Sequence, residues 1–209
     1  MSEQNSAPED GYRTIKAPCE GLFKAKGSKH FGYVFPLSNE SEVQLHLAFL
    51  RKEHHAARHH AFAYRLGLNG EIWRTQDDGE PNNSAGPPIL GALRSQELTN
   101  CLGVVVRYFG GTKLGVGGLI EAYREAILAA IQTGTIIEKF VTHSIKVEFP
   151  YAQMGAVMSI VKQFHLQPLD TDFQLTCHMR LEIRASLMAT TIQIFSELID
   201  VEATVESPT

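Results

Sequence analysis

Residues 102–133 decide the fold of this chain, and they read LGVVVRYFGGTKLGVGGLIEAYREAILAAIQT. The β-branched run from Leu102 to Tyr108 predicts a buried strand. Gly110 to Gly118 predicts a glycine-rich loop. Leu119 to Thr133 has the period and the Ala, Leu and Ile content of a helix that stops at Gly134. This stretch therefore predicts a strand, a loop and a helix in immediate succession.

Strands, turns and short helices are predicted on the N-terminal side of this stretch. Alternating apolar positions favour strands, the pair Asn69-Gly70 favours a tight turn, and clustered Gly, Pro, Asn and Ser favour a loop. The predicted elements are strands over residues 12–35, 60–68 and 71–75, helices over 41–50 and 89–94, and a loop over 77–88.

The C-terminal part has a cleaner rhythm. Strands are predicted over residues 143–149, 166–170, 174–184 and 201–205, with helices over 151–164 and 187–199. The order β-α-β-β-α-β is that of the ferredoxin-like split unit. We therefore predict an α+β chain of two α/β-type domains: a flexible tail over residues 1–11, an N-terminal domain over 12–139 and a ferredoxin-like C-terminal domain over 140–209.

Composition places the chain among ordinary globular proteins. It has 209 residues, of which 44% are hydrophobic and 20% charged, enough apolar residues to bury a sizeable core. No run of 18 apolar residues occurs, so neither a transmembrane helix nor a membrane partner is predicted. The polar N-terminus does not resemble a secretory signal. Three cysteines far apart in the sequence argue against a disulfide framework, and we expect a cytoplasmic protein.

The charge is distributed unevenly along the chain. The net charge is −4, and residues 1–139 hold 15 Lys/Arg and 15 Asp/Glu. Residues 140–209 hold 4 Lys/Arg and 8 Asp/Glu, so the whole net charge lies there. A uniformly basic coat for nucleic acid is excluded. Any site for a polyanion is expected to be local and to lie in the first part.

Two cations accompany the glycine-rich loop, with Arg107 before it and Lys113 within it. Glycines allow close approach of backbone N–H groups, and a following helix N-terminus adds partial positive charge. The loop matches neither Walker A nor GxGxxG, because Ile120 stands where the last glycine belongs. A structural connection that needs unusual backbone angles is the alternative. The residues predicted to contact an anion are Arg107, Tyr108, Gly110, Gly111, Lys113, Gly117 and Gly118.

The segment RKEHHAARHH at residues 51–60 holds four of the nine histidines. A solvated basic segment is one interpretation. A metal shared by His55 and His59 on a helix is another, although no HExxH motif occurs. We favour a cationic face for phosphate, supported by Arg65, with Tyr108 or Phe109 stacking on an unpaired base. The residues of this segment assigned to the face are Arg51, Lys52, His54, Arg58 and His59.

Three carboxylates, Asp77, Asp78 and Glu80, lie within four positions of the predicted loop. Carboxylates this close need a cation, an arginine or backbone N–H groups to offset their repulsion. We predict that they mainly brace the glycine loop and the basic residues. Turn formation and helix capping are a second interpretation. Magnesium ligation is a third, so these residues are also possible metal ligands. No catalytic residue, cofactor or particular metal is assigned.

Several of these segments together resemble the YigZ/IMPACT family. The similar motifs are Asp77-Asp78-Gly79-Glu80-Pro81, Ala85-Gly86, Pro88-Ile89-Leu90, the run from Arg107 to Leu119, Ala122-Tyr123, and His54 with His59 ahead of a strand. The resemblance covers about residues 15–135, and the remainder fits the bacterial YigZ-like two-domain arrangement. The chain departs from the family pattern at Pro87 and Glu121, where basic residues are usual.

The resemblance implies an N-terminal domain like ribosomal protein S5 domain 2 and elongation factor G domain IV. It implies a C-terminal domain like elongation factor G domain V. Those proteins work on ribosomes and RNA, and eukaryotic members of the family regulate translation initiation. We therefore expect a translation-associated protein whose partner is RNA or the ribosome, bound by residues 51–60 and 107–118 together.

Two other functions remain open at this point. One is a metal-assisted hydrolase with Asp77, Asp78, Glu80 and His59 around a divalent ion. The other is a protein-interaction module that binds translation factors through an apolar surface.

Overall fold

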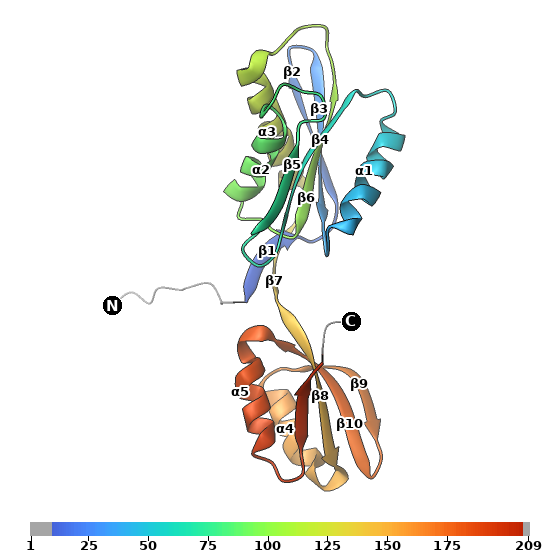
Figure 1. Ribbon diagram of the computed structural model, residues 1–209, viewed down its shortest axis with the longest axis vertical. Coiled ribbons are helices and arrows are strands. Elements are labelled where there is room, and N and C mark those ends of the chain that lie inside the picture. Colours follow the sequence, from blue (N-terminus) through green and yellow to red (C-terminus); the bar gives the residue numbers. More distant parts are fainter. Residues whose placement is uncertain (1–9, 207–209) are drawn as a thin grey trace, which may run out of the picture. The chain divides into compact units, whose positions relative to one another are not determined.

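The computed structural model describes residues 10–206 of the chain (Figure 1). It confirms a mixed α and β protein with several sheets and helices. Tyr12–Lys139 form one compact unit, and Phe140 onward forms a second unit together with Asp10 and Gly11. Among the described residues, no helix is both long and apolar enough to cross a membrane.

A five-stranded sheet forms the centre of the N-terminal unit. Its strands lie in the order β2-β3-β6-β4-β5, and every neighbouring pair is antiparallel. The bounds are β2 Cys19–Ala25, β3 Ser28–Pro36, β4 His59–Leu66, β5 Ile72–Gln76 and β6 Cys101–Tyr108. The predicted buried strand is therefore the central one.

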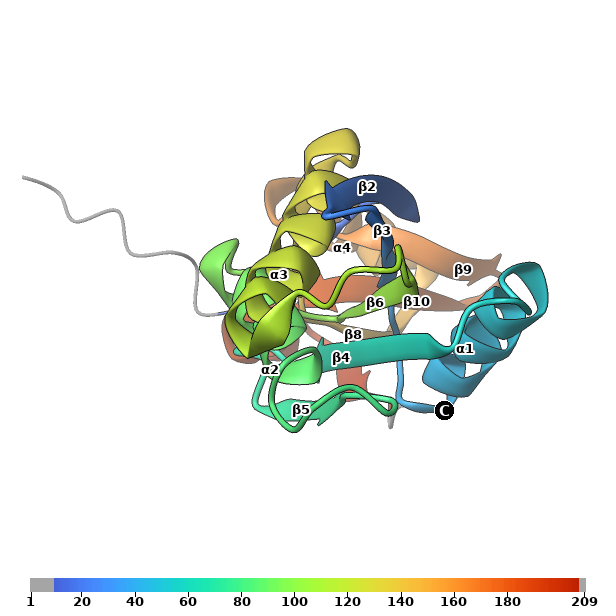
Figure 2. The same ribbon diagram turned by 90° about the horizontal axis from the view of Figure 1, so that it is seen from above.

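Helices cover both faces of this sheet (Figures 1 and 2). The helix α1, Ser41–Glu53, lies on one face, and α2, Gly86–Ser95, and α3, Gly115–Thr133, lie on the other. Alternate residues of β6 supply the two cores, because successive side chains of a strand point to opposite faces. Val104 packs with the α1 cluster and Val105 with the cluster under α2 and α3.

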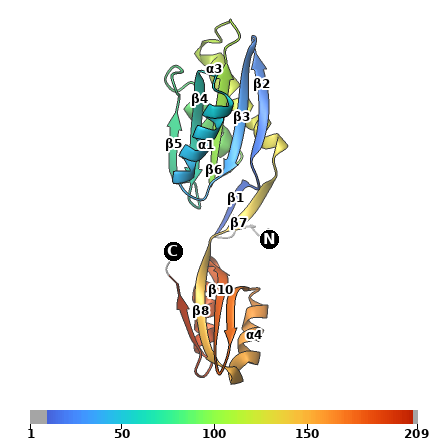
Figure 3. The same cartoon turned by 90° about the vertical axis from the view of Figure 1, so that its right-hand side faces the viewer.

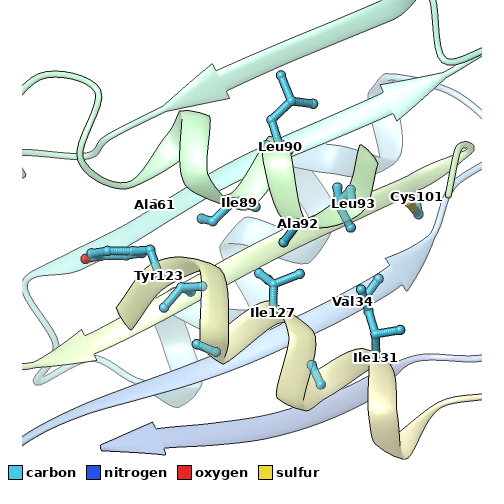
Figure 4. Packing of buried hydrophobic residues seen from close by; sticks show 14 of the residues in the cluster. Val34, Ala61, Ile89, Leu90, Ala92, Leu93, Cys101, Tyr123, Ile127 and Ile131 are labelled. Atoms are coloured by element: carbon cyan, nitrogen blue, oxygen red, sulfur yellow. The ribbon is translucent and has the colours of Figure 1, made fainter. Parts of the chain in front are cut away.

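The contact between α3 and the sheet is unusually close. Figure 4 shows Ile89 and Leu93 of α2 beside Ile127 of α3. A Cβ atom at Gly32 of β3 would lie 2.1 Å from the carbonyl oxygen of Ala126. Only glycine fits beneath the helix there, and this approach holds the second half of α3 against β3.

Both helices that follow the predicted loops begin earlier than predicted. The helix α3 begins at Gly115 instead of Leu119, so Gly117 and Gly118 belong to its first turns. The helix α2 begins at Gly86 instead of Ile89. Its first turn contains two prolines, which helices tolerate there because the first N–H groups have no intrahelical partner. Both helix starts were predicted too late because glycine and proline, which also favour loops, stand in the first turns.

A small two-stranded sheet pairs β1, Gly11–Ile15, with β7, Ile136–Phe140. The predicted tail over residues 1–11 is wrong at its last two positions, and residues 1–9 lie outside the described part. Asp10 is buried, and its carboxylate accepts hydrogen bonds from Arg184 Nη2 at 2.6 Å and from the Ser186 N–H at 2.9 Å. The Arg184 guanidinium holds the pKa of Asp10 far below its ordinary value.

The C-terminal unit follows the predicted order of strands and helices. A 3₁₀ turn at Tyr151–Gln153 precedes the first helix. The elements are β8 Thr142–Pro150, α4 Met154–Gln163, β9 Gln167–Phe173, β10 Thr176–Arg184, α5 Ala185–Ser196 and β11 Glu202–Val205. The strands form an antiparallel sheet in the order β11-β8-β10-β9. Figure 3 shows α4 beside β8 and β10.

Candidate nucleic-acid interface

The basic segment after α1 and the glycine segment after β6 meet at one end of the N-terminal sheet. The register of β4 on β6 places His59 directly opposite Arg107. A pocket of about 400 Å³ opens between the two segments. Its lining consists of Ala56, Arg58, His59, Arg107, Tyr108 and Phe109. The meeting point thus combines cationic and aromatic side chains from two parts of the sequence.

Arg107 forms the buried centre of this site. It is 7% exposed, and its Nη1 donates a hydrogen bond to Glu80 Oε1 at 2.6 Å. The Tyr123 hydroxyl of α3 donates to the same oxygen at 2.7 Å, and burial together with Glu80 raises the pKa of Tyr123. Because Glu80 balances the charge of Arg107, Arg107 anchors the pocket and supplies little positive charge to it.

Histidines flank Arg107 on both neighbouring strands. His30 of β3 is opposite Arg107 on one side, as His59 is on the other. His30 is fully buried and packs edge-on against Tyr123, with the ring centroids 5.4 Å apart. Burial, followed by the charge of Arg107, lowers the pKa of His30 to about 4. His30 is therefore neutral at pH 7.

His59 is fixed by the carboxylate loop. Its Nδ1–H donates to the carbonyl oxygen of Asp78 at 2.9 Å, which leaves the proton off Nε2 in the neutral ring. Nε2 lies 3.9 Å from Glu80 Oε1. The loop therefore sets the orientation of a histidine that lines the pocket.

The three carboxylates have separate structural partners. Asp77 accepts from the N–H groups of Asn83, Ala85 and Gly86 at the start of α2. Asp78 accepts from the His60 N–H at 2.7 Å and lies 3.8 Å from Arg51 Nη2. Glu80 accepts from Arg107 and Tyr123, as described above. The described contacts thus tie the loop to Arg51, His59 and Arg107.

The arrangement of the side chains does not support the two metal sites considered from the sequence, one at the carboxylates and one at His55 and His59. In residues 10–206, no group of three or more His, Cys, Asp or Glu side chains is placed to hold one metal ion. The helix α1 ends at Glu53, so His55 and His59 do not share a helix face.

His54 lies beside the pocket and is held by tyrosines. Its Nε2 is 2.7 Å from the Tyr33 hydroxyl and its Nδ1 is 3.0 Å from the Tyr108 hydroxyl. Burial lowers the pKa of His54. Both ring nitrogens are occupied, so we assign His54 to positioning Tyr108 and no longer to binding an anion.

The glycines of the segment serve different purposes. Gly110 abuts the turn between β2 and β3, where a Cβ would lie 1.9 Å from the carbonyl carbon of Gly27. Its N–H donates to Ser28 Oγ at 3.1 Å, so that donor is used internally. Gly111 has φ +89° and open space around its Cα. Gly117 also has open space around it, in the first turns of α3, where N–H groups lack intrahelical partners.

The remaining cations divide into exposed and engaged groups. Lys52, Arg58 and Lys113 are exposed, and none of them forms an ion pair within the described part of the chain. Arg65 donates to the carbonyl oxygens of Leu98 and Asn69 at the opposite end of β4. Arg65 therefore does not support the predicted face.

Sequence reasoning left three exposed lysines out of the site. Lys24, Lys26 and Lys29 lie on the β2–β3 hairpin, and Lys29 is directly opposite Tyr108. The sequence signal that could have indicated them is the cluster of three lysines around Gly27. Their relation to residues 107–110 depends on a strand pairing about 80 residues apart in the sequence.

The fold is that of a mixed α and β protein, and its N-terminal unit matches a known domain family. The family described as "Impact N-terminal domain" matches residues 26–131. The chain is 32% identical to IMPACT family member YvyE of Bacillus subtilis, over 73% of this chain and 70% of that protein. It is 30% identical to IMPACT family member YigZ of Escherichia coli, over 75% and 79% of the two chains. The chain belongs to the IMPACT family.

A solved structure supports the fold across both units. A crystal structure of a hypothetical protein matches with a TM-score of 0.69 at 23% identity. The match covers 97% of this chain and all of the other, at 100%. This likeness concerns the fold alone.

Proposed function

We propose that the protein binds single-stranded RNA at this pocket and acts in translation. The observation that carries the proposal is the exposed Phe109 ring beside cationic side chains. Phe109 is 58% exposed, and the Arg107 guanidinium carbon lies 5.7 Å from its ring centroid. An exposed ring accepts a stacked base of any identity. Arg58 lines the same pocket as Phe109, and Lys113 follows Phe109 by four residues in the sequence. Both side chains are exposed and can meet phosphates.

The two units support the choice of RNA as the partner. We infer that the strand order β11-β8-β10-β9 with two helices belongs to the ferredoxin-like type. We infer further that the N-terminal unit belongs to the type of ribosomal protein S5 domain 2. Both types resemble parts of proteins that work on the ribosome. This support is analogy between folds, so the assignment depends on the pocket.

Binding of a labelled single-stranded RNA, measured by fluorescence anisotropy at two salt concentrations, tests the proposal. We expect affinity on the order of micromolar that weakens as salt rises, because counterions are released from phosphates. Arg58→Gln should reduce the magnitude of the salt slope by about 0.7, the contribution of one phosphate contact on a single strand.

The stacking part has its own variant and control. Phe109→Ala should weaken binding by roughly tenfold, since stacking on one base contributes about 1–3 kcal/mol, and it should leave the salt slope unchanged. Trp73→Ala is the matched control, because Trp73 is a 51% exposed aromatic on the edge strand β5. Absence of RNA binding, or binding that ignores salt, would reject the proposal and favour a protein partner.

A further inference from the structure

A row of side chains crosses the end of the N-terminal sheet on the side that carries α1. Lys24 of β2 is directly opposite Lys29 of β3, and Lys29 is directly opposite Tyr108 of β6. Directly opposite residues on antiparallel strands point to the same face. Tyr108 contacts His54 at the end of α1, so this face is the α1 face. Lys24 and Lys29 are exposed.

Arg58 continues the row toward β4. His59 of β4 is directly opposite Arg107 of β6. Because the two strands are antiparallel, Arg58, one residue before His59, comes opposite Tyr108, one residue after Arg107. Arg58 and Tyr108 both line the pocket. Adjacent strands are about 4.8 Å apart, so the row from Lys24 to Arg58 extends over about 15 Å.

The hairpin that carries the lysines is fixed against the pocket. The β2–β3 turn, the loop after β6 and the connection from α1 to β4 lie at the same end of the sheet (Figure 1). Gly27 and Gly110 approach so closely that neither position has room for a side chain, and the Gly110 N–H is bonded to Ser28 Oγ. The lysines therefore keep a constant place relative to Phe109, which precedes Gly110.

Positive charge predominates along this row. Lys24, Lys29 and Arg58 form no ion pair within residues 10–206. Glu80 is buried against Arg107. Two exposed carboxylates lie on the same face as the row, Glu53 at the end of α1 and Glu20, four residues before Lys24 on β2. Neither forms an ion pair with the row in the described part of the chain. The row is thus a local cationic feature in a chain whose net charge is −4.

We propose that Lys24, Lys29 and Arg58 bind successive phosphates of the RNA strand whose base stacks on Phe109. This inference rests on the proposed function and extends its site onto the β2–β3 hairpin. The partner is single-stranded, because a base must leave its own stack to lie on Phe109. A length of about 15 Å along the sheet suits an extended strand of a few nucleotides.

The experiment compares two double variants that remove equal charge. Lys24→Gln/Lys29→Gln alters the row, and Lys16→Gln/Lys139→Gln alters two exposed lysines elsewhere in the same unit. The probe is a fluorescent oligouridine of about 10 nucleotides, titrated at about 50 and about 200 mM salt. We expect the row variant to reduce the magnitude of the salt slope by about 1.4 and the affinity by about tenfold. The control variant should match the wild type.

Each outcome decides a separate point. Equal slopes for the row variant and the wild type would overturn the row while leaving RNA binding in place. A wild-type protein that does not bind the oligonucleotide would overturn the proposed function and the row with it. Competition by duplex RNA as strong as that by the single strand would contradict the single-stranded path. Circular dichroism of each variant verifies that the hairpin substitutions preserve the fold.

Discussion

Arg107 shows how single residues define this site. Its guanidinium is placed between two histidines by strand register and is paired with a carboxylate from a distant loop. A buried ion pair of this kind contributes little net stability as a pair, yet removing one partner leaves an isolated buried charge. Glu80 is therefore important because Arg107 is present.

Glu80→Gln tests this dependence at the residue scale. We expect the free energy of unfolding to fall by about 3–5 kcal/mol, because the Arg107 charge loses its buried partner. Urea denaturation of the wild type and the variant gives the value. A combined Glu80→Gln/Arg107→Met variant should regain part of the loss. A change below about 1 kcal/mol in the single variant would mean that water reaches the pair.

The buried His30 should make the free energy of unfolding decrease in acid. Its pKa is lowered from 6.5 to about 4 in the folded protein, so the unfolded chain binds more protons between these values. Stability from this residue is full above pH 6.5 and is lost as pH falls. We expect a loss of about 2 kcal/mol between pH 7.5 and pH 5.

Chemical denaturation of wild type and His30→Phe at the two pH values isolates this effect. The Phe variant keeps an aromatic ring against Tyr123 and has no proton to bind. Burial also lowers the pKa of His46, His54 and His60, so both proteins should lose stability in acid. The wild type should lose more, and identical losses would assign the sensitivity to these other three histidines.

At the scale of elements, the sequence predicted helices and strands wherever apolar periodicity was continuous. The strand over residues 102–108 was predicted from its β-branched run, and the hairpin of β4 and β5 from alternation on either side of Asn69-Gly70. The order from β8 to β11 was predicted from alternating strands and two helical periods. The starts of α2 and α3 were placed too late, because their first turns contain glycine and proline. At the start of α2 the backbone donors are satisfied by Asp77, which lies outside the helix and which no local helical pattern includes.

Asp77 accepts hydrogen bonds from backbone N–H groups at the start of α2, so we expect it to stabilise that helix. Its carboxylate accepts from Ala85 and Gly86 at 3.0 and 2.8 Å. Asp77→Ala should lower the free energy of unfolding by about 1–2 kcal/mol, as the loss of a helix cap does. Asp77→Asn, which keeps one acceptor oxygen, should lose less. Thermal denaturation followed by circular dichroism provides the comparison, and equal losses would show that charge matters more than the acceptor.

At the scale of the whole molecule, the sequence by itself determined the family, the α and β content and the two segments of interest. Local motifs from residues 77 to 123 were specific enough for the family, which the matched domain over residues 26–131 confirms. The charge count also located all the excess acid in residues 140–209. These properties depend on composition and on short spacings, and both are present in the unfolded chain.

Only the tertiary structure decided which role each residue has in the candidate site. Arg107 became a neutralised anchor, His54 a partner of two tyrosines, and the β2–β3 lysines neighbours of the pocket. Each assignment depends on pairing between strands or loops that are 20 to 80 residues apart. Register is fixed by burying apolar faces on both sides of β6, a collective requirement of the folded sheet. Local sequence therefore carries the chemistry of each side chain, while packing of the sheet selects its partners.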